Sequence, residues 1–406
     1  MHPRDIRIAD YSYTLPDEKI ARYPLPERDT SKLLVYREGA IIESVFYKLH
    51  EFLPRGSLLV FNNTKVVPAR LRFVTHTGAT VEVFCLEPSH PITDMATAMQ
   101  QTSPATWWCM VGNASKWRKG TLTISQGDFT LTAAVGSREG GSFSITFNWQ
   151  PSVMSFAEML EIAGKVPIPP YLNRESEPED KFRYQTIFAK HKGSVAAPTA
   201  GLHFTERVFT SLHNAGCETG EITLHVGAGT FKPVKTEKME GHDMHSEEFV
   251  IHSDFLGHLM KKSEIQDPIV AVGTTSLRVL ETLYWIGIKL HSGYKLNFAQ
   301  PAISQWEAYE LSKSLTPAQS LEILWDYMQS RNIKELHTRT QILISPPYKP
   351  MLADALITNF HQPQSTLLLL VAALVGEEWR KIYHYALTHE FRFLSYGDSS
   401  LLYVNK

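Results

Sequence analysis

Four segments of the chain combine glycine with hydroxyl, amide or imidazole side chains, next to an apolar run typical of a β-strand. They are 195–204, 225–231, 273–276 and 357–363. In open α/β sheets, ligands bind beyond the carboxyl ends of the strands, where such loops gather. Glycine lets a ligand approach the backbone, and a helix N-terminus offers free N–H groups to a carboxylate or hydroxyl. We therefore expect the loops after residues 194, 225, 272 and 357 to converge on one pocket.

Each segment also has an ordinary structural interpretation. A Gly-Thr-Thr-Ser sequence before a helix, as at 273–276, is most often a turn followed by an N-cap. The sequence Gly227-Ala228-Gly229 lacks the third glycine of a dinucleotide fingerprint, so it gives little support to a Rossmann site. His225 lies on the strand face opposite Leu224 and Val226, as a solvated histidine would. From the residues alone, the ligand is an unidentified polar molecule.

Two further clusters have competing interpretations. His242 and His245, with Glu247, have residue types that can bind a metal, but no second ligand pair at zinc spacing accompanies them. A polar active-site or surface loop is therefore favoured there, and we expect no metal. The segment 116–119, Lys-Trp-Arg-Lys, combines cations with an aromatic ring. It can contact RNA, although a solvated hairpin tip is the commoner explanation.

The length and composition favour a globular protein of two domains. The chain has 406 residues, of which 43% are hydrophobic and 20% are charged. Its three cysteines, Cys85, Cys109 and Cys217, are odd in number and widely spaced. They indicate neither a disulfide framework nor a four-thiolate zinc site, and they suit a reducing compartment.

Nothing in the sequence indicates export or membrane insertion. Residues 1–16 are polar and lack the apolar core of a signal peptide, and the apolar run 367–375 is too short to span a bilayer. We therefore expect a cytoplasmic protein with no membrane partner. The net charge of −2 gives nucleic acid no general attraction, although residues 60–150 hold seven Lys and Arg against five Asp and Glu. Binding of RNA would need local basic patches.

The pattern of apolar residues and turns changes twice along the chain. The run 58–61 is continuously apolar, as in a strand covered on both faces. From about 65 to 149, short alternating stretches separated by glycine turns are typical of a small sandwich or barrel. After 150, strands alternate with helices. We predict helices from Thr205 to Gly216, from Gly273 to Gly287 and from Ser365 or Thr366 to Gly376.

The predicted fold class is α/β. A layered α/β main domain, residues 1–60 and 150–406, carries an inserted small β-barrel domain at 61–149.

Long motifs are spread over nearly the whole chain. They are 10–16 (DYSYTLP), 23–29 (YPLPERD), 61–70 (FNNTKVVPAR), 166–171, 183–186, 195–205, 223–231, 242–247, 272–278, 357–366 and 395–398. Together, and in this order, they resemble the motifs of the S-adenosylmethionine:tRNA ribosyltransferase-isomerase family. The resemblance implies the same discontinuous α/β domain with an inserted barrel. It agrees with the change of pattern found independently.

The resemblance also implies a reaction. S-adenosylmethionine donates its ribosyl group to the aminomethyl arm of 7-aminomethyl-7-deazaguanine at the tRNA wobble position, adenine and methionine leave, and epoxyqueuosine forms. The implied partners are S-adenosylmethionine and a tRNA bearing that base in the anticodon. S-adenosylmethionine is a co-substrate, so no cofactor is expected, and we expect a monomer.

Roles for individual residues follow from the matching motifs. The sulfonium acidifies the ribose 5′ methylene, so a general base can start the rearrangement, and histidine suits that role. We expect His203 or His225 as the base, with Glu247 as an orienting or acidic partner. The expected substrate-binding residues are Pro198, Thr199, Gly201, Gly227, Gly229, Thr230, Gly273, Thr274, Thr275, Asn359 and His361. The expected RNA-binding residues are Lys65, Arg70, Lys116, Arg118 and Lys119.

Three alternatives remain open at this point. The family usually has Asp where Asn63 stands and Arg where Lys65 stands, so the chain could be a paralogue with a shifted acceptor. A non-catalytic RNA-binding protein is disfavoured, because pure binding needs aromatics and cations more than a polar pocket. An ordinary methyltransferase is disfavoured because no full glycine-rich first loop follows an N-terminal strand.

Overall fold

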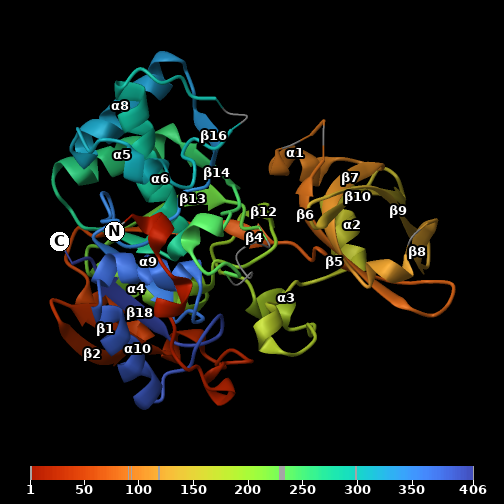
Figure 1. Ribbon diagram of the computed structural model, residues 1–406, viewed down its shortest axis with the longest axis horizontal. Helices are drawn as coiled ribbons and strands as arrows, with labels where there is room; N and C mark the ends of the chain where they lie inside the picture. Colours follow the sequence, from red (N-terminus) through yellow and green to blue (C-terminus); the bar gives the residue numbers. More distant parts are fainter. Residues whose placement is uncertain are drawn as a thin grey trace.

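Nine strands form the largest sheet of the molecule (Figure 1), in a computed structural model that describes residues 2–89, 91–92, 94–117, 119–227, 234–297 and 300–405. In order across the sheet they are β16 (Glu335–Thr340), β14 (Glu247–His252), β13 (Glu218–Leu224), β3 (Leu58–Asn62), β15 (Ile269–Val272), β17 (Ala355–Asn359), β18 (Ser399–Tyr403), β1 (Lys32–Arg37) and β2 (Ala40–Val45). Strand β18 pairs with β1, so both ends of the chain contribute to this sheet.

Four adjacent strands of this sheet run parallel. They are β13, β3, β15 and β17, and their carboxyl ends share one edge of the sheet. The neighbouring pairs β13–β14, β14–β16 and β17–β18 are antiparallel. The sheet is therefore mixed, with a parallel centre from which three of the four predicted ligand loops emerge, while the segment 195–204 follows a strand outside this sheet.

Helices cover both faces of the sheet. Successive side chains of its central strands point to opposite faces, and the apolar side chains on each face pack against helices. On β3, Leu58 and Val60 pack with one core and Leu59 and Phe61 with another. The first core includes residues of α5 (Ser253–Glu264), α6 (Thr274–His291), α8 (Pro317–Ser330), α9 (Thr366–Val375) and α10 (Glu378–Thr388). The second includes α4 (Glu206–Asn214) and the 3-10 helix Phe46–Phe52. A continuously apolar strand is thus buried on both faces, as predicted.

Local signals in the sequence determine where three of these helices begin. The Thr205 side chain accepts a hydrogen bond from the Val208 amide and caps α4, while Ser365 caps α9 through the Leu368 amide. The rings of Phe204 and Phe209, which flank the α4 cap, are 5.5 Å apart at their centroids and form a hydrophobic staple across it. The backbone of Gly273 has φ +88° before α6, a conformation that favours glycine.

The predicted end of α6 is wrong. The helix continues through Gly287 to His291, because this glycine serves packing and does not terminate the helix. A Cβ atom at Gly287 would lie 2.1 Å from the backbone oxygen of Ser320 on α8. The hydroxyl of Ser320 in turn donates to the Tyr284 carbonyl over 2.5 Å. Glycine therefore allows the close approach of two helices that cover the main sheet.

A second sheet contains seven strands paired antiparallel throughout. In order they are β11 (Gly164–Lys165), β5 (Arg70–Val74), β6 (Thr80–Pro88), β7 (Ala105–Gly112), β10 (Ser142–Gln150), β9 (Phe129–Glu139) and β8 (Thr121–Gln126). Its apolar face packs on helix α2 (Phe156–Ala163), where Phe156 stacks on Trp107 at 4.4 Å. Helix α1 (Met95–Gln100) follows β6.

The closed barrel predicted for this part of the chain is not confirmed. Strands β5 and β8 are in contact, so the sheet is curled, but no pairing among the described residues joins β8 to the opposite edge. Helix α2 covers part of the apolar face, so the sheet can bury its core without closing. Figure 1 shows this sheet beside the main one, with the short parallel pair β4 (Thr64–Val66) and β12 (His191–Ser194) between them.

The mixed α/β architecture predicted for the chain is present. The division into domains at residues 60 and 150 stays a prediction, and the second sheet itself runs from residue 70 to residue 165. The helices α3 (Asp180–Arg183) and α7 (Glu307–Glu310) are each about one turn long. Among the described residues, no helix has the length and apolar character needed to cross a membrane.

Candidate active site

The largest cavity at the carboxyl ends of the parallel strands is lined by all four predicted loops. It encloses about 850 Å³ of space, part of it open to solvent. Its walls include 196–200, Val226, 273–275 and 358–362, together with 365–367 at the start of α9. The predicted convergence is confirmed for the described residues. Strands β13, β15 and β17 end at one edge of the sheet, and 196–200 reach the same pocket from β12, which pairs with β4.

Two helix N-termini border this main pocket. Thr274 and Thr275 begin α6, and Thr366 and Leu367 begin α9. The first amides of a helix have no partner within it and point toward its N-terminal end. The hydroxyl of Thr275 is buried and has no hydrogen-bond partner among the described residues. This side of the pocket therefore offers several donors to an anionic or hydroxylated ligand.

Asn359 connects the main pocket to His203. The Asn359 side-chain nitrogen lies 3.1 Å from His203 Nε2, and the hydroxyl of Ser31 lies 2.8 Å from His203 Nδ1. Burial lowers the pKa of His203 to about 4, so its imidazole is neutral at neutral pH. His203 itself lines a smaller neighbouring cavity, and Asn359 stands between it and the main pocket. The other polar side-chain atom of Asn359, Oδ1, is buried with no partner in the described part of the chain and can accept from a ligand.

His361 is the histidine that lines the main pocket within the described part of the chain. Its Nε2 lies 2.9 Å from the hydroxyl of Thr358, and burial lowers its pKa to about 3. Its backbone is held on both sides, because its amide donates to the Tyr383 hydroxyl over 3.1 Å and its carbonyl accepts from the Tyr13 hydroxyl. A neutral imidazole in a fixed position is thus available to a bound ligand.

His225 does not reach the main pocket. Val226 lines the pocket, and His225, the preceding residue, points to the opposite side. There it lies against Gly193, where an added Cβ would be 2.9 Å from His225 Nδ1. Burial, with a smaller contribution from neighbouring His191, lowers the pKa of His225 to about 4. The alternation of side chains along this strand, visible in the sequence, explains the separation.

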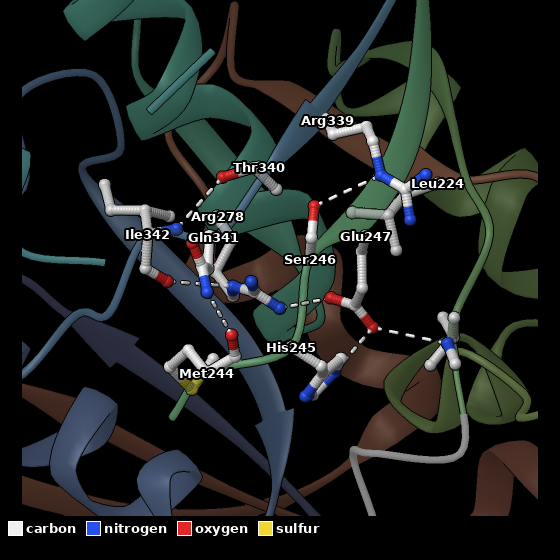
Figure 2. Close-up of polar contacts among 12 residues, drawn as sticks. Leu224, Met244, His245, Ser246, Glu247, Arg278, Arg339, Thr340, Gln341 and Ile342 are labelled. Carbon is white, nitrogen blue, oxygen red and sulfur yellow. Dashed lines mark hydrogen bonds and ion pairs between the residues drawn. The ribbon is translucent and has the colours of Figure 1, made fainter. Parts of the chain in front are cut away.

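Glu247 lies at an adjoining cavity of about 420 Å³ rather than at the main pocket. Figure 2 shows Glu247 between Arg278, to which it is ion-paired, and His245, whose Nε2 is 3.2 Å from Glu247 Oε1. Burial by itself would raise the pKa of Glu247, but Arg278, His245 and the Gly227 amide together outweigh this effect and lower the pKa to about 2. Glu247 is therefore ionised at neutral pH, and its partners are Arg278 and His245 rather than His203 or His225.

The remaining predicted binding residues divide into three groups. Pro198, Thr199, Gly273, Thr274 and Thr275 line the main pocket. Gly201 is buried in the core, where an added Cβ would lie 2.6 Å from the Phe188 ring, and the Gly227 amide lies 3.4 Å from Glu247 Oε1. Gly229 and Thr230 lie outside the described residues.

Sequence reasoning assigned no role to Arg278. A charged residue within the apolar sequence of α6, one turn after Thr274, was the available signal. No described group of three His, Cys, Asp or Glu side chains is arranged to share a metal ion, and the contacts of His245 are those with Glu247.

The predicted RNA-binding residues do not form a single patch. Arg70 lines an open cleft of about 1,010 Å³, open solvent included, with Arg72, Lys165 and Arg174. Lys116 and Lys119 are exposed on the connection between β7 and β8, and Arg118 lies outside the described residues. Lys65 belongs to the short strand β4, where it is in register with Lys192.

Sequence comparison with known proteins places the chain in a family. The model of the family described as "Queuosine biosynthesis protein" matches residues 8–402. The S-adenosylmethionine:tRNA ribosyltransferase-isomerase of Thermosipho africanus is 36% identical, over 98% of this chain and 100% of the relative. The protein of the same name from Trichlorobacter lovleyi is also 36% identical, over 97% of this chain and 99% of the relative. The chain belongs to the queuosine biosynthesis protein family.

A solved member of similar sequence is the S-adenosylmethionine tRNA ribosyltransferase of Thermotoga maritima. Its crystal structure is 27% identical, covers 97% of this chain and 99% of its own, and superposes with a TM-score of 0.46. The family assignment rests on the sequence matches, which extend over nearly the whole length of both chains.

Because its histidines are buried, the protein should lose stability in acid, and substitution of His225 measures the contribution of one of them. Its pKa is about 4 in the folded protein and near 6.5 when exposed, so the unfolded chain binds the extra proton between these pH values. Stability therefore falls as pH drops from about 6.5 to 4, by about 2–3 kcal/mol for this residue. In His225→Gln, the free energy of unfolding should fall by that much less between pH 7.5 and pH 4.5, measured by urea titration.

The matched control is His213→Gln, at an exposed position of α4. It should show the pH dependence of the wild type. Equal pH dependence in His225→Gln and the wild type would contradict the assignment of a low pKa to His225.

Proposed function

We propose that this chain transfers and isomerises the ribosyl group of S-adenosylmethionine onto 7-aminomethyl-7-deazaguanine at the wobble position of tRNA. The products are epoxyqueuosine in the tRNA, adenine and methionine. The observation that carries the proposal is the match to family members of this name over nearly the full length of both chains. The polar pocket at the carboxyl edge of the parallel strands supports it.

The main pocket is proposed to hold the adenosine part of S-adenosylmethionine. Amides and hydroxyls at the N-terminus of α6 suit the ribose hydroxyls, and the unpartnered Oδ1 of Asn359 can accept a hydrogen bond from the adenine amino group. Pro198 and Thr199 supply part of the opposite wall. In this assignment His203 is a positioning residue, because it acts on the ligand only through Asn359.

The proposed general base is His361 rather than His203 or His225. The positive sulfur weakens the C–H bonds of the adjacent ribose 5′ carbon, so a neutral imidazole within reach can remove a proton from that carbon. The freed electron pair forms a C4′–C5′ double bond as the C4′–O4′ bond breaks. The pair on O4′ then makes an aldehyde at C1′, and adenine leaves with the N9–C1′ pair and takes up a proton. The substrate amine adds to C4′ and gives up a proton, and the electron pair returned to C5′ closes the carbon ring on C1′. The C1′ alkoxide displaces methionine from C5′, so the epoxide forms as methionine leaves with the electron pair of the carbon–sulfur bond. His361 is neutral and lines the pocket in which this carbon would lie.

Product analysis tests the proposed function. The wild-type protein, incubated with S-adenosylmethionine and tRNA carrying 7-aminomethyl-7-deazaguanine, should release adenine and methionine in equal amounts, measured by chromatography. Formation of S-adenosylhomocysteine would instead identify a methyltransferase. Binding of tRNA without turnover would identify a non-catalytic RNA-binding protein, and turnover only on a different tRNA base would identify a paralogue with a shifted acceptor.

Substitution of His361 should separate catalysis from binding. In His361→Gln, kcat should fall by about 10²- to 10⁴-fold, because a general base contributes that much, while the affinity for S-adenosylmethionine changes little. Single-turnover kinetics and equilibrium binding measure the two quantities. The control is His384→Gln, an exposed histidine on α10, which should keep wild-type turnover. Near-normal turnover in His361→Gln would exclude this residue as the base.

The cleft around Arg70 is the proposed contact for the tRNA backbone. Its walls hold four cations, Arg70, Arg72, Lys165 and Arg174, against Glu82 and Glu175, in a chain whose net charge is −2. Arg70, Arg72 and Lys165 each stand 3.6 Å from a carboxylate oxygen, at the edge of ion-pair range, so phosphates can compete for them. Lys116 and Lys119 lie on the connection that begins with the cleft residue Asn113, and they extend the same surface in this proposal, as does Lys65.

Removing charge from this cleft should weaken tRNA binding in a salt-dependent manner. The double variant Arg72→Gln/Lys165→Gln should bind tRNA less tightly, and the slope of log affinity against log salt should fall by roughly 1.5, at about 0.7–0.9 per lost phosphate contact. Affinity for S-adenosylmethionine should stay unchanged. The control Lys48→Gln/Lys261→Gln removes the same charge from two exposed positions outside the cleft. Lys48 lies in the 3-10 helix Phe46–Phe52, and Lys261 lies in α5. An unaltered salt slope in the cleft variant would contradict the proposal.

Three further features belong to the same proposal. The protein acts in the cytoplasm as a monomer and needs no cofactor besides its co-substrate. The curled sheet and the nine-stranded sheet correspond to two domains, with the curled sheet carrying most of the tRNA contact. The position of the short β4–β12 pair between the two sheets supports this division (Figure 1).

A further inference from the structure

A buried ion pair lies at the wall of the cavity that adjoins the main pocket. Arg278 is 6% exposed and Glu247 is 2% exposed, and both line this cavity (Figure 2). Burial of two charges carries a large desolvation cost, which their mutual attraction offsets only when further hydrogen bonds satisfy both groups. The surroundings are otherwise mostly apolar, with Ile342, Leu343 and Leu370 among the lining residues. Buried charges at a cavity wall are suited to bind a charged ligand.

The hydrogen bonds of this pair are incomplete. Arg278 donates through Nε to the Ile342 carbonyl over 3.2 Å and through Nη1 to Glu247, but its Nη2 is buried without a partner among the described residues. The hydroxyl of Thr275, one turn earlier on the same helix, is also buried without a partner. Both residues line the adjoining cavity. Two unsatisfied donors at one wall need an acceptor that the described residues do not supply.

The adjoining cavity and the main pocket meet at the helix N-termini. Both are lined by Thr274, Thr275, Thr366 and Leu367, at the first turns of α6 and α9. A ligand of two linked parts can therefore occupy both cavities at once. S-adenosylmethionine has this form, because an adenosine and an amino acid are joined at its sulfonium.

We propose that the adjoining cavity binds the amino-acid end of S-adenosylmethionine. The carboxylate accepts from Arg278 Nη2 and the Thr275 hydroxyl, and the ammonium pairs with Glu247, whose Oε1 faces His245 and the Gly227 amide. The inference rests on the proposed function. It assigns one charge of the zwitterion to each member of the buried pair, and it places the sulfonium at the junction of the two cavities, next to the pocket that holds His361.

A purely structural ion pair explains less. It accounts for the contact between Arg278 and Glu247, but it leaves Nη2 of Arg278 and the Thr275 hydroxyl unsatisfied at a cavity wall. The pair Arg174–Asp180 provides the comparison within this chain. It is similarly buried, and its members satisfy each other through two hydrogen bonds of 2.7 and 2.8 Å.

The test compares two ligands on several variants in the absence of tRNA. The ligands are S-adenosylmethionine and its decarboxylated analogue, which keeps the adenosine, the sulfonium and the amine. Wild-type protein should bind S-adenosylmethionine about 10- to 100-fold more tightly, as for a charged hydrogen bond. Glu247→Gln/Arg278→Gln removes both charges without leaving one unmatched, and it should bind the two ligands with nearly equal affinity.

Two further variants keep the test decisive. Thr275→Val preserves the shape of the side chain and should reduce the preference for the carboxylate by about 3- to 10-fold, as for a single hydrogen bond. Lys289→Gln/Glu307→Gln removes a largely buried pair that lines neither cavity, and it should keep the wild-type preference. The proposal is overturned if the wild type shows no preference, or if both cavity variants retain it in full. If the wild type still releases adenine and methionine in that case, the proposed function stands and only this assignment fails.

Discussion

The parallel alignment of β13, β3, β15 and β17 is the constraint on which the candidate site depends. Their register places four strand ends at one edge, so the loops after β13, β15 and β17 line a single pocket, together with residues 196–200 after β12. Burial on both faces maintains this alignment, since alternate residues of each strand pack into different cores. Close contact between α6 and α8 at Gly287 contributes to one of these cores and fixes the helix whose N-terminus borders the pocket.

Electrostatics then distinguish the parts of the site. Burial keeps the imidazole of His361 in the main pocket, and that of His203 beyond Asn359, neutral, so neither places a positive charge near the sulfonium of the proposed substrate. The opposite holds at Glu247, where Arg278, His245 and the Gly227 amide together overcome the effect of burial and keep the carboxylate ionised. The adenosine pocket is therefore neutral and polar, while the adjoining cavity carries one charge of each sign. A substrate that joins a polar, uncharged adenosine to a zwitterionic amino acid fits that division.

Much of this arrangement could be predicted from sequence because it depends on local signals and on one rule of sheet topology. Apolar runs identified the strands, Thr205 and Ser365 marked helix starts, and the rule about strand ends brought the loops together. The failures depend on tertiary packing. Gly287 is a helix contact and not a helix end, the curled sheet covers its core with α2 without closing, and the significance of Arg278 appears only when Glu247, from a different strand, is placed against it.

Hydrogen exchange with and without S-adenosylmethionine tests the central claim, that this substrate occupies the pocket formed by the four strand-end loops. Slower exchange on binding is expected in peptides covering 195–204, 272–280 and 356–370, which include the first turns of α6 and α9. No change is expected in peptides of β8 and β9 in the curled sheet. Binding that protects the curled sheet and leaves these three segments unchanged would contradict the account.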